Sequence, residues 1–450
     1  MLWINARLRP GASILTEMAS SSAHPSDQNM TVPQIAARTG ASRAPRHLRG
    51  RTLCAVILGF ASLLLGCSPT RTFEAIDVLA DIAAGPGPSH FKRTTIEPSR
   101  RPVAYAIATR WHTGDLYEPA QLADAALVLV PGLAPEGKDD PRLVAFARTL
   151  ARARFRVLVP DIPSMREQKV APSDSRDIAD AIVHLAASSN AGTPSTLGLV
   201  AFSYAVGPAI LATLQDDVHG HVAFIVAIGG YYDIEAAITY VTTGYFHDPR
   251  TRGWQRRAPN EYGKWIFARG NAERLTLRRD RDLLSRVAQR KMTNPEAEVD
   301  DLVGKLGPEG RAVYMLLANK EPAAVPQLIA ALPPTIREDM AALDLRRHDL
   351  SRLPPRLILV HGRDDAIIPA SESEKLAHAA AGRAELYLVD SLTHVDLGVA
   401  GISDTLTLLG AVYQLLAERD ALTESAHDRR EDRLAVQLAS KIRRGSAAAP

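Results

Sequence analysis

The sequence predicts an α/β protein, with a doubly wound, mostly parallel sheet, helices on both faces and a helical cap insertion. Between about residues 100 and 420, short apolar runs typical of buried strands alternate with amphipathic runs typical of helices. A serine lies directly between one such strand and the helix that follows it. The alternation stops over residues 234–353, where only helical patterns remain, so we expect the cap there.

The composition indicates a folded protein with a large core and excludes some kinds of partner. The chain has 450 residues, of which 46% are hydrophobic and 23% charged, as is typical of globular proteins. A formal net charge of +3 is too small to favour nucleic acid, and the cysteines and histidines lack the spacing of a zinc site. We therefore expect no nucleic-acid partner and no bound metal.

The amino-terminal region carries a targeting pattern. Residues 1–43 form a Ser-, Ala-, Pro- and Arg-rich extension that is either disordered or untranslated. Residues 44–66 contain a basic stretch and then the apolar run 53–65, which has the length of a signal-peptide core and is too short for a comfortable membrane span. We interpret 44–66 as a signal peptide, with a short signal anchor or a buried helix as the alternatives.

The end of this segment resembles a bacterial lipobox, in which a cysteine is lipidated and the preceding peptide is cut away. Two leucines and Gly66 stand directly before Cys67. The resemblance implies a membrane-anchored lipoprotein attached through Cys67. Ser68 after the cysteine resembles the signal for the outer membrane, here on its periplasmic side. The other cysteine, Cys54, lies in the removed segment, so no disulfide is expected.

The rest of the chain divides into five expected segments. These are a tether and domain start at 67–100, a first core part at 101–233, the helical cap at 234–353, a second core part at 354–422 and a polar basic tail at 423–450. Core strands are expected at 103–108, 127–130, 155–161, 197–202, 222–228, 356–360 and 384–389. The insertion is large enough to cover a site as a cap, although a helical subdomain that only adds stability has the same pattern.

The serine between strand and helix is Ser203, which directly follows the strand 197–202. Ala201 and Ala205 lie two residues before and after it. These positions must be small because strand and helix approach each other closely around a tight turn. The usual pattern has glycine at both positions, and alanine satisfies the same steric requirement. The pattern predicts a nucleophile elbow, and the alternative is an ordinary serine at a strand end.

Two further polar residues follow later strands. Asp365 comes after the strand 356–360, and His394 comes after the last strand. Serine, acid and histidine in this chain order, each at the carboxyl end of a strand, resemble the α/β-hydrolase superfamily. The resemblance covers about residues 100 to 420 apart from the insertion. It implies that Ser203 is the nucleophile, His394 the general base and Asp365 the residue that orients the imidazole.

Two other aspartates compete for the role of the acid. Asp364 is the immediate neighbour of Asp365, and successive residues of a turn point in different directions. Asp233 lies shortly after the strand 222–228, where some members of the superfamily place the acid. We favour Asp365, which stands at the family's position four residues before Pro369, with Asp233 as the alternative.

The expected chemistry also needs an oxyanion hole. A serine hydroxyl is a weak nucleophile until an adjacent base takes its proton, and the charge that then develops on the substrate oxygen needs N–H donors. Tyr204, directly after the nucleophile, supplies one backbone N–H. The resemblance implies a second donor in the loop after the strand 127–130, where Leu133 is preferred and Ala134 comes next.

Together these patterns predict a serine hydrolase that cleaves a carboxylic ester or related small-molecule acyl substrate. The reaction would pass through an acyl-enzyme and use no metal or organic cofactor. The alternatives are an amidase or peptidase of the same fold and a non-catalytic, envelope-binding lipoprotein. Several aromatic side chains either line an acyl pocket or pack the core and cap, namely Tyr231, Tyr232, Trp254, Trp265 and Phe267.

Overall fold

The computed structural model describes residues 68–188, 196–249, 251, 253–397 and 400–446. The expected extension at 1–43, the signal peptide at 44–66 and the lipidation site Cys67 lie outside the described residues. Among the described residues, no helix is both long enough and apolar enough to span a bilayer.

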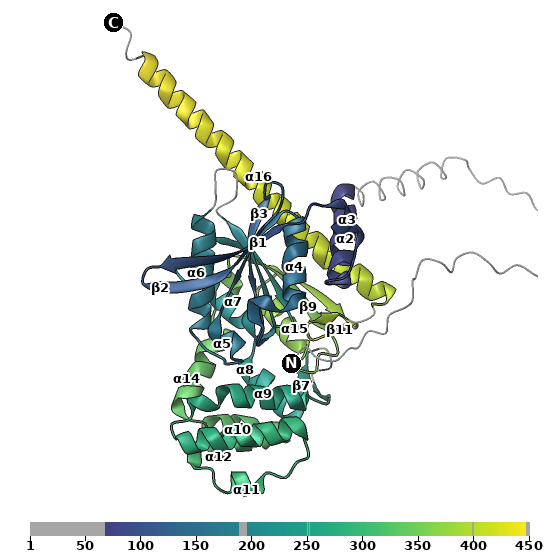
Figure 1. The fold of residues 1–450 in the computed structure, drawn as a ribbon, viewed down its shortest axis with the longest axis vertical. Helices are drawn as coiled ribbons and strands as arrows, with labels where there is room; N and C mark the ends of the chain where they lie inside the picture. Colours follow the sequence, from purple (N-terminus) through teal and green to yellow (C-terminus); the bar gives the residue numbers. More distant parts are fainter. Residues whose placement is uncertain (1–67, 189–195, 250, 252, 398–399, 447–450) are drawn as a thin grey trace, which may run out of the picture. The chain divides into compact units, whose positions relative to one another are not determined.

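The centre of the fold is an eight-stranded sheet in which only β2 runs against the other strands (Figure 1). In spatial order the strands are β1 (Ser99–Ile107), β2 (Arg110–Glu118), β4 (Phe155–Pro160), β3 (Ala125–Val130), β5 (Leu197–Phe202), β6 (Val222–Ile228), β9 (Arg356–Gly362) and β10 (Ala384–Val389). β2 is antiparallel to both of its neighbours, and the strands from β4 to β10 pair in parallel. The predicted doubly wound, mostly parallel sheet is confirmed.

β2 has no counterpart among the predicted strands. Its first half is polar and mostly exposed, and only its second half, from Gly114 to Tyr117, pairs with β4. The apolar part is therefore too short to leave a strand pattern in the sequence. A side chain at Gly114 would place its Cβ 2.6 Å from the carbonyl oxygen of Val159, so glycine permits the close pairing of the two strands.

Helices cover both faces of the sheet. Along β3, Val128 belongs to one buried apolar cluster and its neighbour Leu127 to another, because successive side chains of a strand point to opposite faces. The first face carries α6 (Asp174–Ala187), α7 (Val206–Thr213) and α15 (Ser371–Ala379), and the second carries α2 (Pro69–Ala84), α4 (Pro141–Arg152) and α16 (Ile402–Ser446). Every residue of β3 and β5 is buried as a result.

The last helix is longer than the sequence predicts. The sequence predicts a polar basic tail from residue 423, whereas α16 continues to Ser446. From residue 423 to residue 444 the sequence contains neither glycine nor proline, so no helix-breaking residue ends the helix before Gly445. Leu416 and Leu422 lie in the core cluster on the side of α2, so this part of α16 is packed against the core.

Between β6 and β9 the chain forms a group of helices, here called the cap. They are α8 (Ile234–Thr243), α9 (Glu261–Asn271), α10 (Arg278–Thr293), α11 (Asp300–Val303), α12 (Pro308–Ala318), α13 (Val325–Ala330) and α14 (Pro334–Leu343). α10 lies beside both α9 and α12 (Figure 1), and a buried cluster that includes Trp265 and Leu283 packs this group. A short hairpin of β7 (Tyr245–Asp248) and β8 (Gly253–Arg256) was not expected, because strands of four residues leave no clear pattern.

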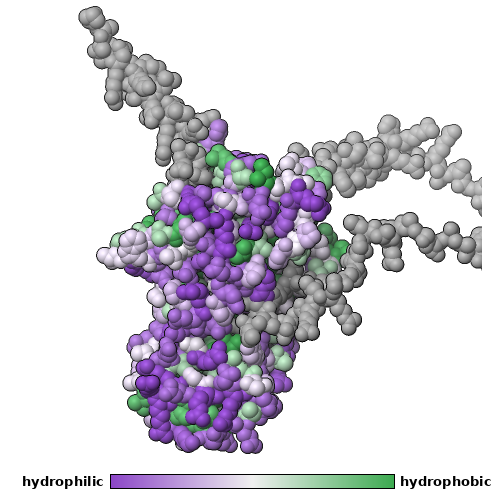
Figure 2. All heavy atoms as spheres, in the orientation of Figure 1, coloured by the Kyte–Doolittle hydropathy of each residue, from purple (hydrophilic) through white to green (hydrophobic). Residues whose placement is uncertain are grey.

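The described surface is predominantly polar on the face drawn in Figure 2. Hydrophilic residues predominate there, and hydrophobic residues form small separate groups. Scattered apolar side chains of this kind are normal on a folded protein.

Candidate active site

Ser203 lies on the turn between β5 and α7. A single 3₁₀ turn, Ser203–Ala205, leads from the strand into the helix. The φ angle of Ser203 is +55°, in the left-handed region that residues other than glycine rarely adopt. Ala201 and Ala205 have no exposed surface, so strand and helix approach closely at both flanking positions. This is the strained geometry of a nucleophile elbow.

The imidazole of His394 stands between Ser203 and Asp365. Its Nε2 lies 2.7 Å from Ser203 Oγ, and its Nδ1 lies 2.7 Å from Asp365 Oδ2. Because an ionised carboxylate can only accept, Nδ1 carries the hydrogen and donates it to Asp365. Nε2 is then the acceptor for the serine hydroxyl. The three residues expected from the sequence are thus brought into hydrogen-bonding contact.

Asp365 is fully buried and has four hydrogen-bonding neighbours. Oδ1 accepts from the backbone N–H groups of Ile367, at 2.7 Å, and Ile368, at 3.0 Å, while Oδ2 faces His394 and lies 3.3 Å from His361 Nε2. Burial alone would raise the pKa of Asp365, but the charge of His394 and the hydrogen bonds from both histidines hold that pKa well below its usual range. The carboxylate is therefore ionised at neutral pH.

His361 is a second histidine behind the acid, and the sequence analysis assigned it no role. It is fully buried at the end of β9. Its Nε2 lies 3.0 Å from the carbonyl oxygen of Ile368, which can only accept, so Nε2 carries the hydrogen. Ser373 Oγ lies 2.7 Å from Nδ1 and donates to it. The signal in the sequence was a histidine directly at the strand end before Asp365.

The competing aspartates are engaged elsewhere. Asp233 caps α8 by accepting from the N–H of Ala236 at 3.0 Å, and it pairs with Arg346 at 3.2 Å. The side chain of Asp364 is 68% exposed and pairs with Arg257 at 2.8 Å. The carboxylate that contacts the imidazole is therefore that of Asp365, while Asp233 and Asp364 serve local structure.

Gly229 is a further residue of the site that the sequence analysis did not assign. It follows β6 and has a φ angle of +64°. A Cβ atom at this position would lie 3.3 Å from the carbonyl oxygen of His394 and 3.4 Å from its Nδ1. Glycine thus satisfies both an unusual backbone conformation and a close approach to the imidazole.

The expected oxyanion donors lie around the same turn. The N–H of Tyr204 is at the start of a helical turn, where the first N–H groups have no acceptor within the helix. Gly132, directly before Leu133, packs against the elbow, because a Cβ there would lie 3.3 Å from Phe202 O and 3.4 Å from Ser203 Cβ. The loop that carries Leu133 and Ala134 therefore lies next to the nucleophile.

The aromatic residues considered for an acyl pocket lie in different surroundings. Tyr231 is buried in the core, Tyr232 packs against the same apolar cluster, and Trp265 is buried in the cap. Trp254 and Phe267 are 57% and 41% exposed. These side chains therefore do not form one common apolar wall. Over the ranges that the structure describes, no group of three or more His, Cys, Asp or Glu side chains is placed to hold a metal ion.

The strand order, with β2 alone reversed, and the strained serine turn after β5 are those of the α/β-hydrolase fold, and this chain has that fold. The sheet carries the candidate residues at the carboxyl ends of β5, β9 and β10. In open α/β sheets this is the edge at which ligands bind.

Comparisons with known proteins add likenesses of fold. Neither a scan against family models nor a search of curated proteins finds a match. The structure resembles an acylaminoacyl peptidase from Pyrococcus horikoshii (10% identity, 72% of this chain and 41% of that chain, TM-score 0.40). It also resembles the α/β-hydrolase GrgF from Penicillium sp. (14%, 72% and 99%, 0.42) and a protein from Legionella pneumophila (13%, 73% and 90%, 0.47).

This chain spans 41% and 42% of the length of the first two peptidase structures that it resembles. These TM-scores all lie below 0.5. The fold class therefore rests on the strand order and on the turn at Ser203, and the activities of these proteins are not carried over to this chain.

Proposed function

We propose that the chain is a serine hydrolase that cleaves a carboxylic ester or a related acyl substrate. One observation supports this proposal above all. The imidazole of His394 lies within 2.7 Å of both Ser203 Oγ and Asp365 Oδ2, with the serine on a strained turn. A hydroxyl, a base and a buried ionised acid in this order form the arrangement that activates serine.

The reaction follows from these positions. Ser203 Oγ attacks the substrate carbonyl carbon while its proton passes to His394 Nε2. The negative oxygen of the tetrahedral intermediate is stabilised by the backbone N–H groups of Tyr204 and Leu133. The intermediate collapses, the leaving group takes the proton from His394, and an acyl-serine remains. A water molecule then gives a proton to His394 and attacks the acyl carbon. The second intermediate collapses, Ser203 Oγ takes the proton back from His394, and the carboxylic acid is released.

Asp365 contributes through charge and orientation. Its carboxylate holds the hydrogen on Nδ1, which leaves Nε2 free to accept the serine proton. When His394 becomes an imidazolium, the negative charge 2.7 Å away stabilises it. The buried surroundings of Asp365 strengthen this interaction because little water screens it.

Serine-directed labelling tests the nucleophile. A fluorophosphonate should label the purified protein on Ser203, and Ser203→Ala should remove the label. Ser351→Ala, which alters an exposed serine in a surface turn, should keep it. A label that survives Ser203→Ala contradicts the assignment.

A substrate panel separates the remaining classes. We would compare p-nitrophenyl esters of increasing chain length with the matching p-nitroanilides. Faster ester cleavage supports the proposal, and faster anilide cleavage favours an amidase or peptidase. The absence of both labelling and turnover would favour a non-catalytic binding protein.

We also propose that the protein is held at the bacterial outer membrane, facing the periplasm, by a lipid on Cys67. α2 begins at Pro69, close after this cysteine. On one side of α2, Phe73 and Ile76 are 70% and 47% exposed, which suits a helix close to a bilayer. Cys67→Ser should abolish incorporation of labelled palmitate, whereas Cys54→Ser should not. Palmitate on the Cys67→Ser protein would contradict the anchor.

A further inference from the structure

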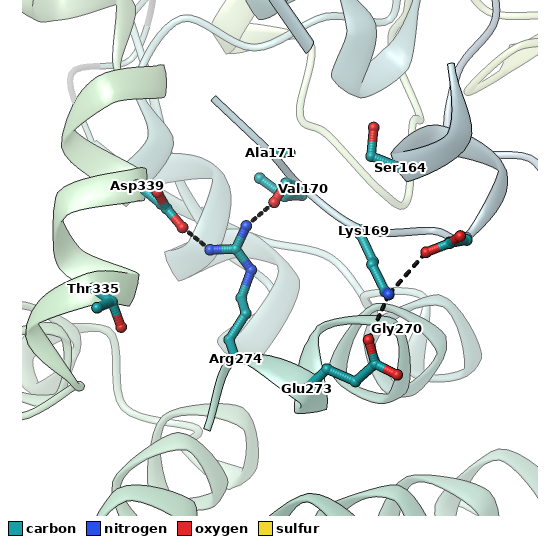
Figure 3. A pocket seen from close by; sticks show the side chains of 10 residues that line it. Ser164, Lys169, Val170, Ala171, Gly270, Glu273, Arg274, Thr335 and Asp339 are labelled. Carbon is teal, nitrogen blue, oxygen red and sulfur yellow. Dashed lines mark hydrogen bonds and ion pairs between the residues drawn. The ribbon is translucent and has the colours of Figure 1, made fainter. Parts of the chain in front are cut away.

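A cavity of about 480 Å³ lies between the core segment 164–171 and two cap segments, 270–274 and 335–339 (Figure 3). Its charged side chains form pairs, Arg274 with Asp339 and Lys169 with both Glu167 and Glu273. Since these charges already have partners, the cavity itself points to no particular ligand. The contacts that cross it, however, connect the cap to the core.

The cap binds both polar groups of the Val170 backbone. The N–H of Val170 donates to Asn271 Oδ1 at 3.1 Å, at the end of α9. The carbonyl oxygen of Val170 accepts from Nη2 of Arg274, and Nη1 of the same guanidinium pairs with Asp339 of α14 (Figure 3). The position of Val170 is therefore fixed by the cap and not by the sheet.

The next residue carries this restraint to the catalytic turn. The N–H of Ala171 donates to the hydroxyl of Tyr204 at 3.0 Å, and that hydroxyl donates to Asp174 Oδ2 at 2.8 Å. Asp174 also accepts a hydrogen bond from Ser164. Tyr204 and Asp174 are both buried, so these bonds form without competition from water.

A second path from the cap reaches the same ring. Tyr204 stacks on Tyr231 with ring centroids 6.4 Å apart and an interplanar angle of 15°. The hydroxyl of Tyr231 donates to the carbonyl oxygen of Leu343, the last residue of α14, at 3.1 Å. The side chain of Tyr204 is thus held on two sides by groups that the cap positions.

The protonation states agree with these bonds. Burial, together with the charge of Asp174, raises the pKa of Tyr204 well above its ordinary value, so the hydroxyl keeps its proton and can donate. Burial raises the pKa of Asp174 to about 6, against the effect of its hydrogen bonds from Ser164 and Tyr204. The carboxylate is therefore largely ionised, and accepts, at neutral pH.

We propose that Tyr204 is a positioning residue through which the cap holds the oxyanion N–H. This inference rests on the proposed function, in which the backbone N–H of Tyr204 stabilises the oxyanion. The ring and that N–H belong to one residue on a strained turn, so fixing the ring fixes the direction of the N–H. Oxyanion donors lose most of their effect when they are displaced. The cap therefore acts on turnover without touching the substrate.

The first test removes the hydroxyl and keeps the ring. Tyr204→Phe should lower kcat on a p-nitrophenyl ester about tenfold and change KM little, since ground-state binding does not use the oxyanion donor. The control is Tyr105→Phe, because the buried hydroxyl of Tyr105 has no hydrogen-bond partner among the described residues. Tyr105→Phe should keep the kcat of the wild type. A Tyr204→Phe enzyme with normal kcat would overturn the proposal.

The second test starts from the cap. Arg274→Met removes the bond to Val170 and should also lower kcat, while Arg274→Lys should restore part of it. If the two residues act along one path, the kcat of the Tyr204→Phe, Arg274→Met double variant should be close to that of the single variant with the lower kcat. Losses that multiply would show independent effects and overturn the path.

A third measurement needs no substrate. Amide hydrogen exchange of the 168–171 segment should be faster in both Tyr204→Phe and Arg274→Met than in the wild type. Unchanged exchange in both variants overturns the linkage even if the enzyme is active. If both variants exchange faster but the wild-type protein is neither labelled by a fluorophosphonate nor active on the substrate panel, the proposed function is overturned. The catalytic part of this inference is then overturned with it, while the structural linkage stands.

Discussion

At the scale of single residues, Asp365 illustrates how a carboxylate stays charged where water has no access. Two backbone N–H groups bind one of its oxygens and two histidines face the other. The backbone donors are Ile367 and Ile368, two and three residues after Asp365, so the loop that carries the buried carboxylate also supplies its hydrogen bonds. The ionised carboxylate can therefore hold the hydrogen on His394 Nδ1 at neutral pH.

The choice among the three aspartates gives the first prediction. Asp365→Asn should leave the fold intact and lower turnover by up to about 10⁴-fold, because an amide does not hold the hydrogen on His394 Nδ1. Asp364→Asn and Asp233→Asn should lower it far less, since their partners are Arg257 and Arg346. Turnover and thermal melts of the three variants check this. A crippled Asp233→Asn beside a normal Asp365→Asn would contradict it.

Gly229 gives a prediction with a close control. Gly229→Ala should destabilise the fold by about 1–3 kcal/mol because of the positive φ angle, and it should slow turnover because the new methyl group meets His394. Gly382 has a φ angle of +83° with no atom within 4 Å of a built Cβ. Gly382→Ala should therefore lose stability but keep turnover. Equal turnover in both variants would show that Gly229 does not support the imidazole.

Asp174 gives a pH-dependent prediction. Its pKa is raised to about 6 by burial, so the folded protein holds this proton more tightly than the unfolded chain. The stability that this provides is present at low pH and is lost as the pH rises through about 6. Between pH 4 and pH 7, the free energy of unfolding of the wild type should fall by about 2 kcal/mol relative to Asp174→Asn. Urea titrations measure the difference, and a constant offset with pH would disprove it.

At the scale of elements, the first and last helices of the described domain hold each other. Arg419 of α16 is buried, pairs with Glu74 of α2 and donates to the carbonyl oxygen of Ala153 at 2.8 Å. Burial works against its charge, but the bonds and charges of Glu74 and Asp420 raise the pKa of Arg419 above its ordinary value. The helix that follows the candidate lipidation site in the sequence is thereby joined to the last helix of the α/β core.

This pair gives the fourth prediction. Arg419→Met should destabilise the fold by about 2–3 kcal/mol, since it removes the buried bond to the carbonyl oxygen of Ala153 and leaves the partly buried carboxylate of Glu74 without its counter-charge. Turnover of the folded fraction should be unchanged. Arg352→Met, which removes a pair with Asp349 in which both side chains are exposed, should cost about 1 kcal/mol or less. Denaturation midpoints measure both, and equal losses would show that the Arg419 pair is not special.

At the scale of the whole molecule, the sequence predicts what burial makes periodic. The central strands are apolar throughout because helices cover both of their faces, so their positions and their order along the chain could be found. Ser203, Asp365 and His394 could be singled out because each follows such a strand. β2 could not be found, because its first half extends beyond β4, pairs only with β1 and is mostly polar and exposed.

Other parts of the site depend on which strands become neighbours. The direction of side chains in the turn after β9 separates Asp365 from Asp364, and sequence spacing does not fix it. His361 acts through Ser373 and Ile368, and Gly229 through its closeness to His394. These relations arise only when the ends of β6, β9 and β10 lie side by side.

The backbone of Ser203 also limits which side chain could replace the proposed nucleophile. With a φ angle of +55°, this position disfavours any side chain that branches at Cβ. Threonine carries the same hydroxyl but has such a branch, whereas cysteine does not. Protein engineering that keeps this turn can therefore exchange oxygen for sulfur more readily than it can add a methyl group. The backbone conformation of the strand-to-helix turn therefore restricts which side chains this position can carry, in addition to the chemistry that the side chain must perform.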